Sequence, residues 1–368
     1  MENLINKRTL VVAEIGKNFI QTQEERPVEE YLKNAKALVK AAKVAGADAV
    51  KFQTHNVEDE QLNLDVDSPH FKGHSRYKWV KRNTDCTPLD HFWKPLKAYC
   101  DEIGAVFFST PMSRVAAKKL QELGVPFWKV ASSDILDFPM LDFMASTRKP
   151  IILPSGMSTL EELDRAIDFL RKRGASVILL HAISRYPYPP EDSRLATITF
   201  FQKRYPDLTI GFSQNSPWIE PALAAVALGA KVVEQHFTFD RGLWGPDHKV
   251  SMTPDEFRVM TAGIREFEHN PEKKQAYLAG PEIAKYLGDE EKVLQEGESQ
   301  FRPLFRKALM AGQDIPAGAA ITLEMLYAMR PQAHAGGLPS EKYEEVIGKK
   351  VTRIVKKYDP ITFDLLGS

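Results

Sequence analysis

TLVVAEIG (residues 9–16) is the first of eight short apolar runs, and the pattern that these runs share decides the fold. Each run is rich in Val, Ile and Phe, and most are separated from the next by a helix-like stretch. The other seven are ADAVKFQT (47–54), AVFFST (105–110), FWKVASS (127–133), PIILPSG (150–156), SVILLHAI (176–183), LTIGFSQ (208–214) and KVVEQHF (231–237). Neighbouring parallel strands need a long crossover, usually a helix, so the repeated unit predicts a parallel sheet.

Eight such units predict an α/β fold, a (β/α)8 TIM barrel, in which catalytic groups lie at the C-terminal ends of the strands. Nearly every run ends in residues that can bind an anion or move a proton. They are Glu14, Lys51, Gln53, Thr110, Lys129, Ser132, Asp134, Ser155, His181, Ser213, Asn215 and His236. A doubly wound open sheet is the competing fold, but it would gather such groups near one switch point and not on every strand.

The connections between the runs support this fold. Residues 29–46 and 159–174 have apolar residues at helical spacing, and each stretch closes with a Gly. Ser158 or Thr159, followed by Glu161 and Glu162, is typical of a capped helix start. A long polar and aromatic insertion at residues 55–85 is of the kind that covers or shapes a binding site.

The length predicts a second domain, because 368 residues exceed the roughly 250 of a typical barrel. We expect the barrel in residues 1–280, a charged linker in 281–300 and a small β-rich domain in 301–368. The last segment has short strand-like runs broken by turns such as IPAG and YDP.

Composition restricts the partners. The 49 Lys and Arg balance 49 Asp and Glu, so bulk charge gives no reason to expect nucleic acid binding. No apolar stretch approaches the roughly 18 residues that cross a bilayer, and we expect a cytoplasmic protein without a membrane partner. Cys86 and Cys100 are too few for a disulfide framework and match no metal motif, so free thiols are expected.

A set of short motifs is shared with a known family. They are AEIG (13–16), AGADAVKFQTH (45–55), FFSTPMS (107–113), KVASSD (129–134), SGM (155–157), YPYPPED (186–192), GFS (211–213), ALGAKVVEQHFT (227–238), GPDH (245–248), RKAL (306–309), DIPAGAAIT (314–322) and MRP (329–331). In this order and spacing, the chain resembles the sialic acid synthases (N-acetylneuraminate synthases) over essentially its whole length. These enzymes join phosphoenolpyruvate to an N-acylated amino-sugar aldehyde, and the resemblance implies that the C-terminal domain is their antifreeze-like (SAF) domain.

The resemblance implies a role for each matching residue. Phosphoenolpyruvate carries a phosphate and a carboxylate, which need cationic anchors and hydrogen-bond donors. Lys51 would meet the carboxylate, and the other residues of the phosphoenolpyruvate site would be Thr110, Lys129, Ser132, Ser155, Ser184 and Ser213. Asp134 would transfer protons, with Lys51 and Glu14 as the other catalytic residues. Gln53, Tyr186, Asp247 and Arg330 would contact the sugar.

The resemblance also implies a divalent metal, Mn or Mg, which stabilises the negative charge that develops on the aldehyde oxygen. His236 matches one of the two histidine ligands, whereas Asn215 stands at the position of the other. An Asn carbonyl oxygen is a weaker and harder ligand than imidazole, and it suits magnesium or calcium better than zinc.

Other positions also depart from the family pattern. Phe19 replaces a His, Pro154 a phosphate-binding Ser and Ser184 an Asn. Ser155 and Arg185 are adjacent to the last two changes, and we hypothesise that they compensate in binding phosphate.

The leading hypothesis is therefore a synthase that makes a nine-carbon 2-keto-3-deoxy sugar acid of the sialic acid type and releases phosphate. A second hypothesis is a catalytically silent sugar or phosphate binding protein, and a third is an aldolase with a Schiff base on Lys129. In the family the SAF domain of one subunit reaches the partner's barrel, so we expect a domain-swapped homodimer in which Arg330 crosses to the partner's site. A domain of about 65 residues is marginally stable alone, which favours such docking.

Overall fold

The computed structural model describes residues 8–68 and 71–367 and has the eight parallel strands that the sequence predicts. They are β1 (Leu10–Gly16), β2 (Ala49–Thr54), β5 (Val106–Pro111), β6 (Trp128–Lys129), β7 (Ile151–Pro154), β8 (Val177–Ala182), β9 (Thr209–Gln214) and β10 (Val232–His236). The paired strands are parallel, in the order β5-β2-β1-β10-β9-β8-β7-β6. β5 and β6, at the two ends of this order, lie next to each other. The sheet is therefore a nearly closed barrel and not an open doubly wound sheet.

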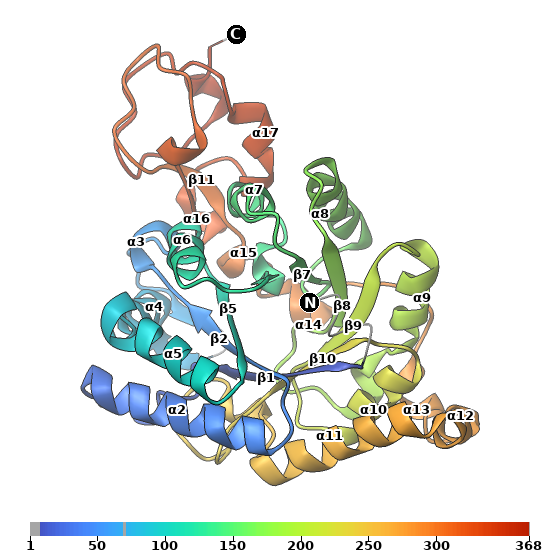
Figure 1. Cartoon of the computed structure of the whole chain (residues 1–368). Coiled ribbons are helices and arrows are strands. Elements are labelled where there is room, and N and C mark those ends of the chain that lie inside the picture. Colours follow the sequence, from blue (N-terminus) through green and yellow to red (C-terminus); the bar gives the residue numbers. More distant parts are fainter. Residues whose placement is uncertain (1–7, 69–70, 368) are drawn as a thin grey trace.

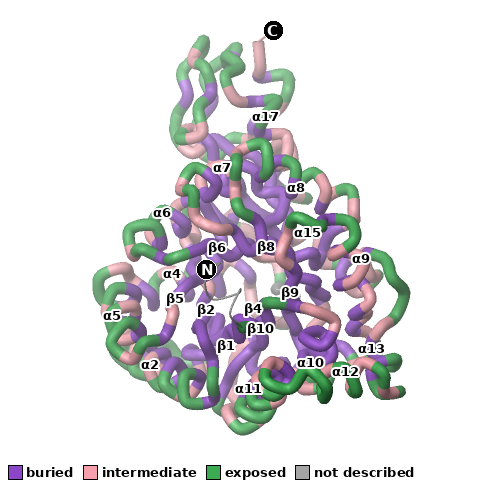
Figure 2. Tube along the Cα trace, turned by 45° about the vertical axis from the view of Figure 1, so that its right-hand side comes forward, coloured by how far each residue is buried: buried purple, intermediate pink, exposed green. Residues whose placement is uncertain are grey.

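Helices form the outer layer, and the buried strands lie inside it (Figures 1 and 2). They are α2 (Val28–Val44), α5 (Lys94–Glu102), α6 (Arg114–Glu122), α7 (Phe138–Ser146), α8 (Leu160–Lys172), α9 (Ala196–Arg204), α10 (Ile219–Ala227) and α11 (Pro254–His269). The predicted cap of α8 is present, because Thr159 and Glu162 each accept a hydrogen bond from the other's backbone N–H. Gly174 follows this helix in the left-handed region, at φ 67°.

Alternation along the strands separates the barrel interior into an apolar and a polar part. Every second residue of a barrel strand points inward. One apolar cluster of the interior comprises Leu10, Val12, Ala49, Phe108, Phe127, Ile152, Ile178, Leu180 and Val232. Two residues further along three of these strands stand Glu14, Lys51 and Glu234, which line the cavity described below. The strands thus place charged groups at their C-terminal ends, on top of an apolar interior.

The predicted insertion is a compact covering of the barrel. It contains α3 (Val57–Glu60), β3 (Asp67–Ser68) paired with β4 (Phe71–Ser75), and α4 (Arg76–Asp85). Phe71 and Trp79 pack edge-to-face against Trp244, which follows β10, at ring-centroid distances of 4.9 and 5.6 Å. The insertion is thereby fixed to the loop after the last strand.

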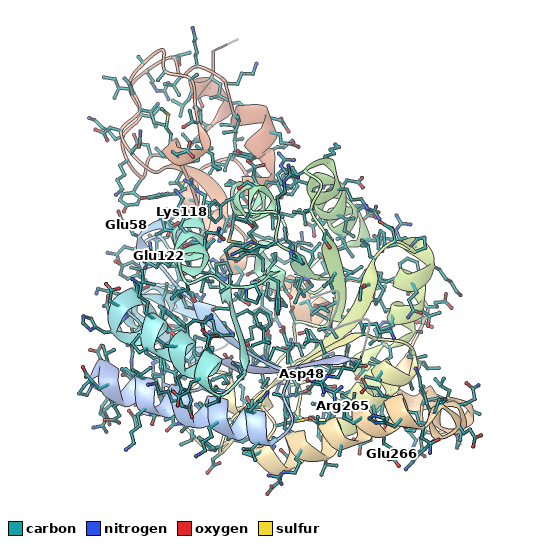
Figure 3. The ribbon with its side chains drawn as sticks, viewed as in Figure 1. Asp48, Glu58, Lys118, Glu122, Arg265 and Glu266 are labelled. Carbon is teal, nitrogen blue, oxygen red and sulfur yellow. The ribbon has the colours of Figure 1, made fainter. Side chains whose placement is uncertain are left out.

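The C-terminal domain is small and β-rich, as predicted. It contains the antiparallel strands β11 (Ala308–Ala311) and β12 (Leu326–Met329), several isolated bridges, and the short helices α16 (Gln332–Ala335) and α17 (Tyr343–Val346). The preceding segment carries α12 (Pro271–Ala279), α13 (Ala284–Leu287), α14 (Glu296–Ser299) and α15 (Arg302–Phe305). The domain contacts the barrel of its own chain (Figure 1), where Lys307 Nζ meets Asp137 Oδ2 at 2.7 Å. Glu58 of α3, labelled in Figure 3, pairs with Lys357 of this domain.

Two expectations from composition can be compared with the structure. Cys86 and Cys100 are free, buried thiols, and burial raises the pKa of each to about 12. None of the helices in the described ranges is long and apolar enough to cross a membrane.

Asp48 supports the end of the barrel that lies opposite the polar residues. It immediately precedes β2 and accepts hydrogen bonds from Arg265 of α11 at 2.6 Å and from Val11 N at 2.9 Å (Figure 3). We expect Asp48→Asn to lower the free energy of unfolding by about 2 kcal/mol, because a buried charge-assisted hydrogen bond is lost. Urea denaturation followed by circular dichroism measures the loss.

Glu266→Gln is the matched control, on α11 next to Arg265. Glu266 forms an exposed pair with Lys273, and its removal should change the unfolding free energy by less than about 0.5 kcal/mol. Equal losses in the two variants would contradict the role given to Asp48.

Candidate active site at the mouth of the barrel

A cavity lies at the C-terminal ends of the strands, and Phe305 and Arg330 contribute to its wall from beyond the barrel. It is lined by every residue predicted for the site except Asp134 and Ser155. The predicted residues that line it are Glu14, Lys51, Gln53, Thr110, Lys129, Ser132, Ser184, Tyr186, Ser213, Asn215, His236, Asp247 and Arg330. The structure thus brings these side chains together, and the role of each stays a prediction.

Four buried charges form an alternating network in this cavity. Lys51 Nζ lies 2.8 Å from Glu14 Oε2 and 3.4 Å from Glu234 Oε1, and it donates to Thr110 Oγ1 at 3.1 Å. Lys129 Nζ lies 3.6 Å from the same Glu234 oxygen. Glu234 therefore bridges the two lysines.

The network holds its members in different protonation ranges. Burial lowers the pKa of Lys129 to about 8, a shift that Glu234 opposes and the charge of Lys51 increases. Burial also disfavours the Lys51 cation, but Glu14 and Glu234 outweigh it and raise the pKa of Lys51. Lys51 is thus a permanent cation near neutral pH, whereas Lys129 loses its proton in mildly alkaline solution.

Hydroxyl groups converge beside the lysines. Gly156 allows this approach, because a Cβ atom there would lie 2.4 Å from Ser184 Oγ and 2.8 Å from Ser132 Oγ. Ser184 Oγ is buried and has no hydrogen-bond partner among the described residues. Ser213 Oγ donates to Glu234 at 3.1 Å. Cations and hydroxyl donors on one wall are suited to an anionic ligand.

Glu298 supports this wall from outside the cavity. It belongs to α14, is 1% exposed, and its Oε1 accepts hydrogen bonds from Met157 N at 2.9 Å and from Ser184 N at 2.8 Å. These amides follow β7 and β8. One buried carboxylate therefore joins the segment before the C-terminal domain to two loops that line the cavity.

Two predicted phosphate contacts, and one further strand-end residue, do not reach the cavity. Ser155 is fully buried on the other side of β7, where its Oγ accepts from Ala182 N at 3.1 Å. The reason is alternation: Pro154 takes the inward position, so Ser155 faces away. Arg185 pairs with Asp192 at 2.8 Å, and His181 bonds Ser193 O. The structure gives no support to compensation by Ser155 or Arg185.

Asp134 does not line the cavity, because its carboxylate is bound by Arg330. The two carboxylate oxygens accept from Arg330 Nη2 at 2.6 and 2.8 Å, and Asp134 is 1% exposed. Burial disfavours the Arg330 cation, but Asp134 outweighs it and raises the pKa of Arg330. In this structure Arg330 lines the cavity of its own chain. Its transfer to the site of a partner subunit stays a prediction.

The other half of the cavity is formed by residues predicted to contact the sugar. Gln53 Nε2 donates to Glu14 at 2.8 Å, and Gln53 Oε1 accepts from Lys17 at 2.7 Å. Lys17 Nζ also lies 3.7 Å from Asp247. Burial raises the pKa of Tyr186, a shift that the negative charge of Asp247 increases, so this hydroxyl keeps its proton.

His236 and Asn215 offer few ligands to a metal ion. Asn215 Nδ2 donates to Ile183 O at 2.6 Å, which leaves the amide oxygen as its ligand atom. His236 Nδ1 is buried without a hydrogen-bond partner among the described residues, so no neighbour fixes its tautomer. Within the described ranges, no three His, Cys, Asp or Glu residues converge as a metal centre requires. The pair fits a hard, weakly held cation whose other ligands are water or substrate oxygens.

Sequence reasoning missed four residues of the site. Glu234 had a local signal, because it is two residues before His236 on the same strand and so faces the same way. Lys17 had the signal of a strand end, because it directly follows β1. Arg76 and Glu298 had none, since each lies on a helix whose position depends on distant contacts.

Enzymes with an eight-stranded parallel barrel carry their active sites at the C-terminal ends of the strands, and lysines placed there suit small anionic ligands. Residues 38–276 match the NeuB family, and residues 306–367 match the SAF domain. The chain therefore belongs to the NeuB family, whose members are phosphoenolpyruvate-dependent synthases of the sialic acid type, and it is an enzyme of this kind.

Individual relatives agree over nearly the whole chain. The N-acetylneuraminate-9-phosphate synthase of Mus musculus is 32% identical over 352 residues, covering 95% of this chain and 90% of that protein. The N,N'-diacetyllegionaminic acid synthase of Campylobacter jejuni is 31% identical and covers 95% and 98%. The crystal structure of spore coat polysaccharide biosynthesis protein spsE from Bacillus subtilis superimposes with a TM-score of 0.77 at 30% identity, covering 98% and 96%.

Glu298 is expected to position the wall that carries Ser184. Glu298→Ala removes the acceptor for two buried N–H groups, at a cost of about 1–3 kcal/mol in stability. We expect the variant to bind phosphoenolpyruvate several-fold more weakly, because the loops after β7 and β8 lose their common anchor. Calorimetric titration with phosphoenolpyruvate and urea denaturation measure the two effects.

The control is Glu296→Ala, which changes an exposed carboxylate on the same short helix. It should leave both quantities unchanged. Wild-type affinity in Glu298→Ala would show that the carboxylate has no influence on the ligand wall.

Proposed function

We propose that the protein condenses phosphoenolpyruvate with an N-acylated amino-sugar aldehyde similar to N-acetylmannosamine. The products are a nine-carbon 2-keto-3-deoxy sugar acid and phosphate. The observation that carries this proposal is that one cavity is lined both by the cations Lys51 and Lys129 and by the polar residues Gln53 and Asp247. We call these two groups the cationic half and the polar half, and we assign the polar half to the acceptor sugar. The named products of the relatives, N-acetylneuraminate 9-phosphate and the legionaminic and pseudaminic acids, differ in the acceptor from which they are built.

The cationic half suits phosphoenolpyruvate. We assign Lys51 to the carboxylate and Lys129 to the phosphate, with the hydroxyls of Thr110, Ser132, Ser184 and Ser213 as further donors. Each lysine has an acid beside it, so neither is an unpaired buried cation before phosphoenolpyruvate binds. Binding would replace part of these ion pairs with contacts to the ligand.

The reaction forms one carbon–carbon bond and breaks one bond to phosphate. Carbon three of the enol attacks the aldehyde carbon, and the aldehyde oxygen takes a proton. Carbon two, left electron-poor, takes up water, which loses a proton, and the resulting intermediate expels phosphate. Glu14 contacts both Lys51 and Gln53 and thus faces both halves of the cavity, so we assign it the proton transfer from water.

Asp134 has a different part in this proposal from the one that the sequence suggested. Because both its oxygens bind Arg330, we assign it the orientation of that guanidinium toward the sugar. His236 and Asn215 would hold a divalent cation, whose chemistry is to polarise the aldehyde.

The changes at Asn215 and Pro154 are of the kind expected in a catalytically silent binding protein, the second hypothesis from the sequence. The retention of Lys51, Lys129, Asp134, His236 and Asp247 argues against it, since a protein that only binds its ligand does not need an acid, two anion anchors and a metal ligand together. We also propose a homodimer in the cytoplasm, and light scattering at micromolar concentration tests the dimer.

Phosphate release from phosphoenolpyruvate tests the function. We expect release only with an N-acylated amino sugar, and we expect magnesium or manganese to support it and chelator to stop it. Lys51→Met should abolish it by removing a carboxylate anchor. Binding of phosphoenolpyruvate without phosphate release, whatever the acceptor, would favour the silent protein. Covalent trapping of pyruvate by borohydride on Lys129 would favour the aldolase.

The proton of Lys129 predicts a pH dependence. Its pKa of about 8 lies below the ordinary 10.5, so the cation is lost as pH rises through 8. We expect the KM for phosphoenolpyruvate to rise by up to about tenfold per pH unit above that value. Lys129→Arg keeps the charge and should remove the rise. Lys51→Arg is the control and should keep the rise, because the raised pKa of Lys51 already keeps that side chain charged. A wild-type KM that does not change between pH 7 and 9.5 would contradict the assignment of Lys129.

A further inference from the structure

Lys17 is a buried cation at the edge of the polar half of the cavity, the acceptor half of the proposed function. It follows Gly16, whose φ of 54° turns the chain at the end of β1, and it is 8% exposed. Its ammonium group donates to Gln53 and lies 3.7 Å from Asp247. These contacts place it beside residues assigned to the sugar, not beside those assigned to phosphoenolpyruvate.

Arg76 is a second buried cation in the same cavity, and most of its hydrogen-bonding capacity is unused. It is 9% exposed, and its guanidinium lies 5.1 Å from the ring centroid of Phe305. Its closest acid is Glu60 at 3.5 Å, which already accepts a hydrogen bond from His55 at 2.8 Å. Among the described residues, the Arg76 side chain has no hydrogen-bond partner, and its buried Nε is one of the unsatisfied atoms. Buried donors in native proteins are nearly always bonded, and a ligand group in the cavity would satisfy this Nε.

The electrostatics favour an anionic ligand over a neutral one. Burial lowers the pKa of Lys17, and the charge of Arg76 lowers it further against the opposing effect of Asp247. Burial likewise lowers the pKa of Arg76 to about 10. A sugar hydroxyl would accept a hydrogen bond without relieving the repulsion between the Lys17 and Arg76 cations. A phosphate or carboxylate group would accept hydrogen bonds and also neutralise part of this charge.

We propose that the acceptor sugar carries an anionic substituent, a phosphate or a carboxylate, which Lys17 and Arg76 bind. This inference rests on the proposed function. Phosphoenolpyruvate does not account for the two cations, because Lys51 and Lys129 provide for its charges in the other half of the cavity.

Matched acceptors test the proposal. Phosphate release is measured with N-acetylmannosamine, its 6-phosphate and the corresponding 6-uronic acid, and the last two arms distinguish phosphate from carboxylate. We expect one anionic form to have a KM at least about tenfold below that of the neutral sugar. Lys17→Met and Arg76→Gln should each raise that KM by about tenfold while changing the KM for phosphoenolpyruvate by less than about twofold.

Lys40→Met, which removes an exposed charge from α2, is the control and should leave every constant unchanged. Lys17→Arg should restore part of the preference, and thermal unfolding shows whether each variant is folded. A neutral acceptor that performs as well as both anionic forms would overturn the proposal. So would variants that weaken all acceptors equally.

The two proposals fail in different ways. If no acceptor releases phosphate, the proposed function fails, and the anion site is then judged by calorimetric titration with N-acetylmannosamine 6-phosphate and with the 6-uronic acid. Binding of either that is lost in Arg76→Gln would still support the site, and absence of binding of both would remove it.

Discussion

Alternation along parallel strands is the constraint on which the rest of this structure depends. Because every second side chain of a barrel strand points inward, the interior is filled by stacked layers. In β1 the inward column reads Leu10, Val12 and Glu14, so the third layer changes from apolar to charged. The inward-facing residues of the eight strands converge at the mouth of the barrel, so charged side chains at the strand ends contact one another. The site is a consequence of how the strands end.

Convergence also dictates the pairing of these charges. Removing ions from water costs several kcal/mol for each, and a lone buried lysine would lose its proton. The order Glu14, Lys51, Glu234, Lys129 places an acid within 3.6 Å of each lysine. The pairing is unequal, because Lys51 has two acids and Lys129 has one that is shared. That inequality accounts for the raised pKa of the first lysine and the lowered pKa of the second.

The parts of the site that the sequence predicts well are those set by local pattern. The eight runs and the polar residues at their ends follow from spacing alone, and so do the barrel and its cavity. Ser155 does not face the cavity, because only alternate residues at a strand end point inward, and the alternation through Ile152 and Pro154 turns Ser155 away. Glu298 and Arg76 were missed for another reason. Their positions depend on contacts with residues far away in the chain, which no local periodicity encodes.

The two halves of the cavity therefore have different origins. The cationic half is built mainly from strand ends and the short loops after them, so the barrel itself fixes it. The acceptor half includes Arg76 of the insertion and Arg330 of the C-terminal domain. These two segments are joined by backbone hydrogen bonds, from Arg330 N to Glu60 O at 2.9 Å and from Leu62 N to Arg330 O at 2.8 Å. Changes in either segment can reshape the polar half while the strands keep the cationic half. Under the proposed function, this division would let one barrel serve a common donor and different acceptors.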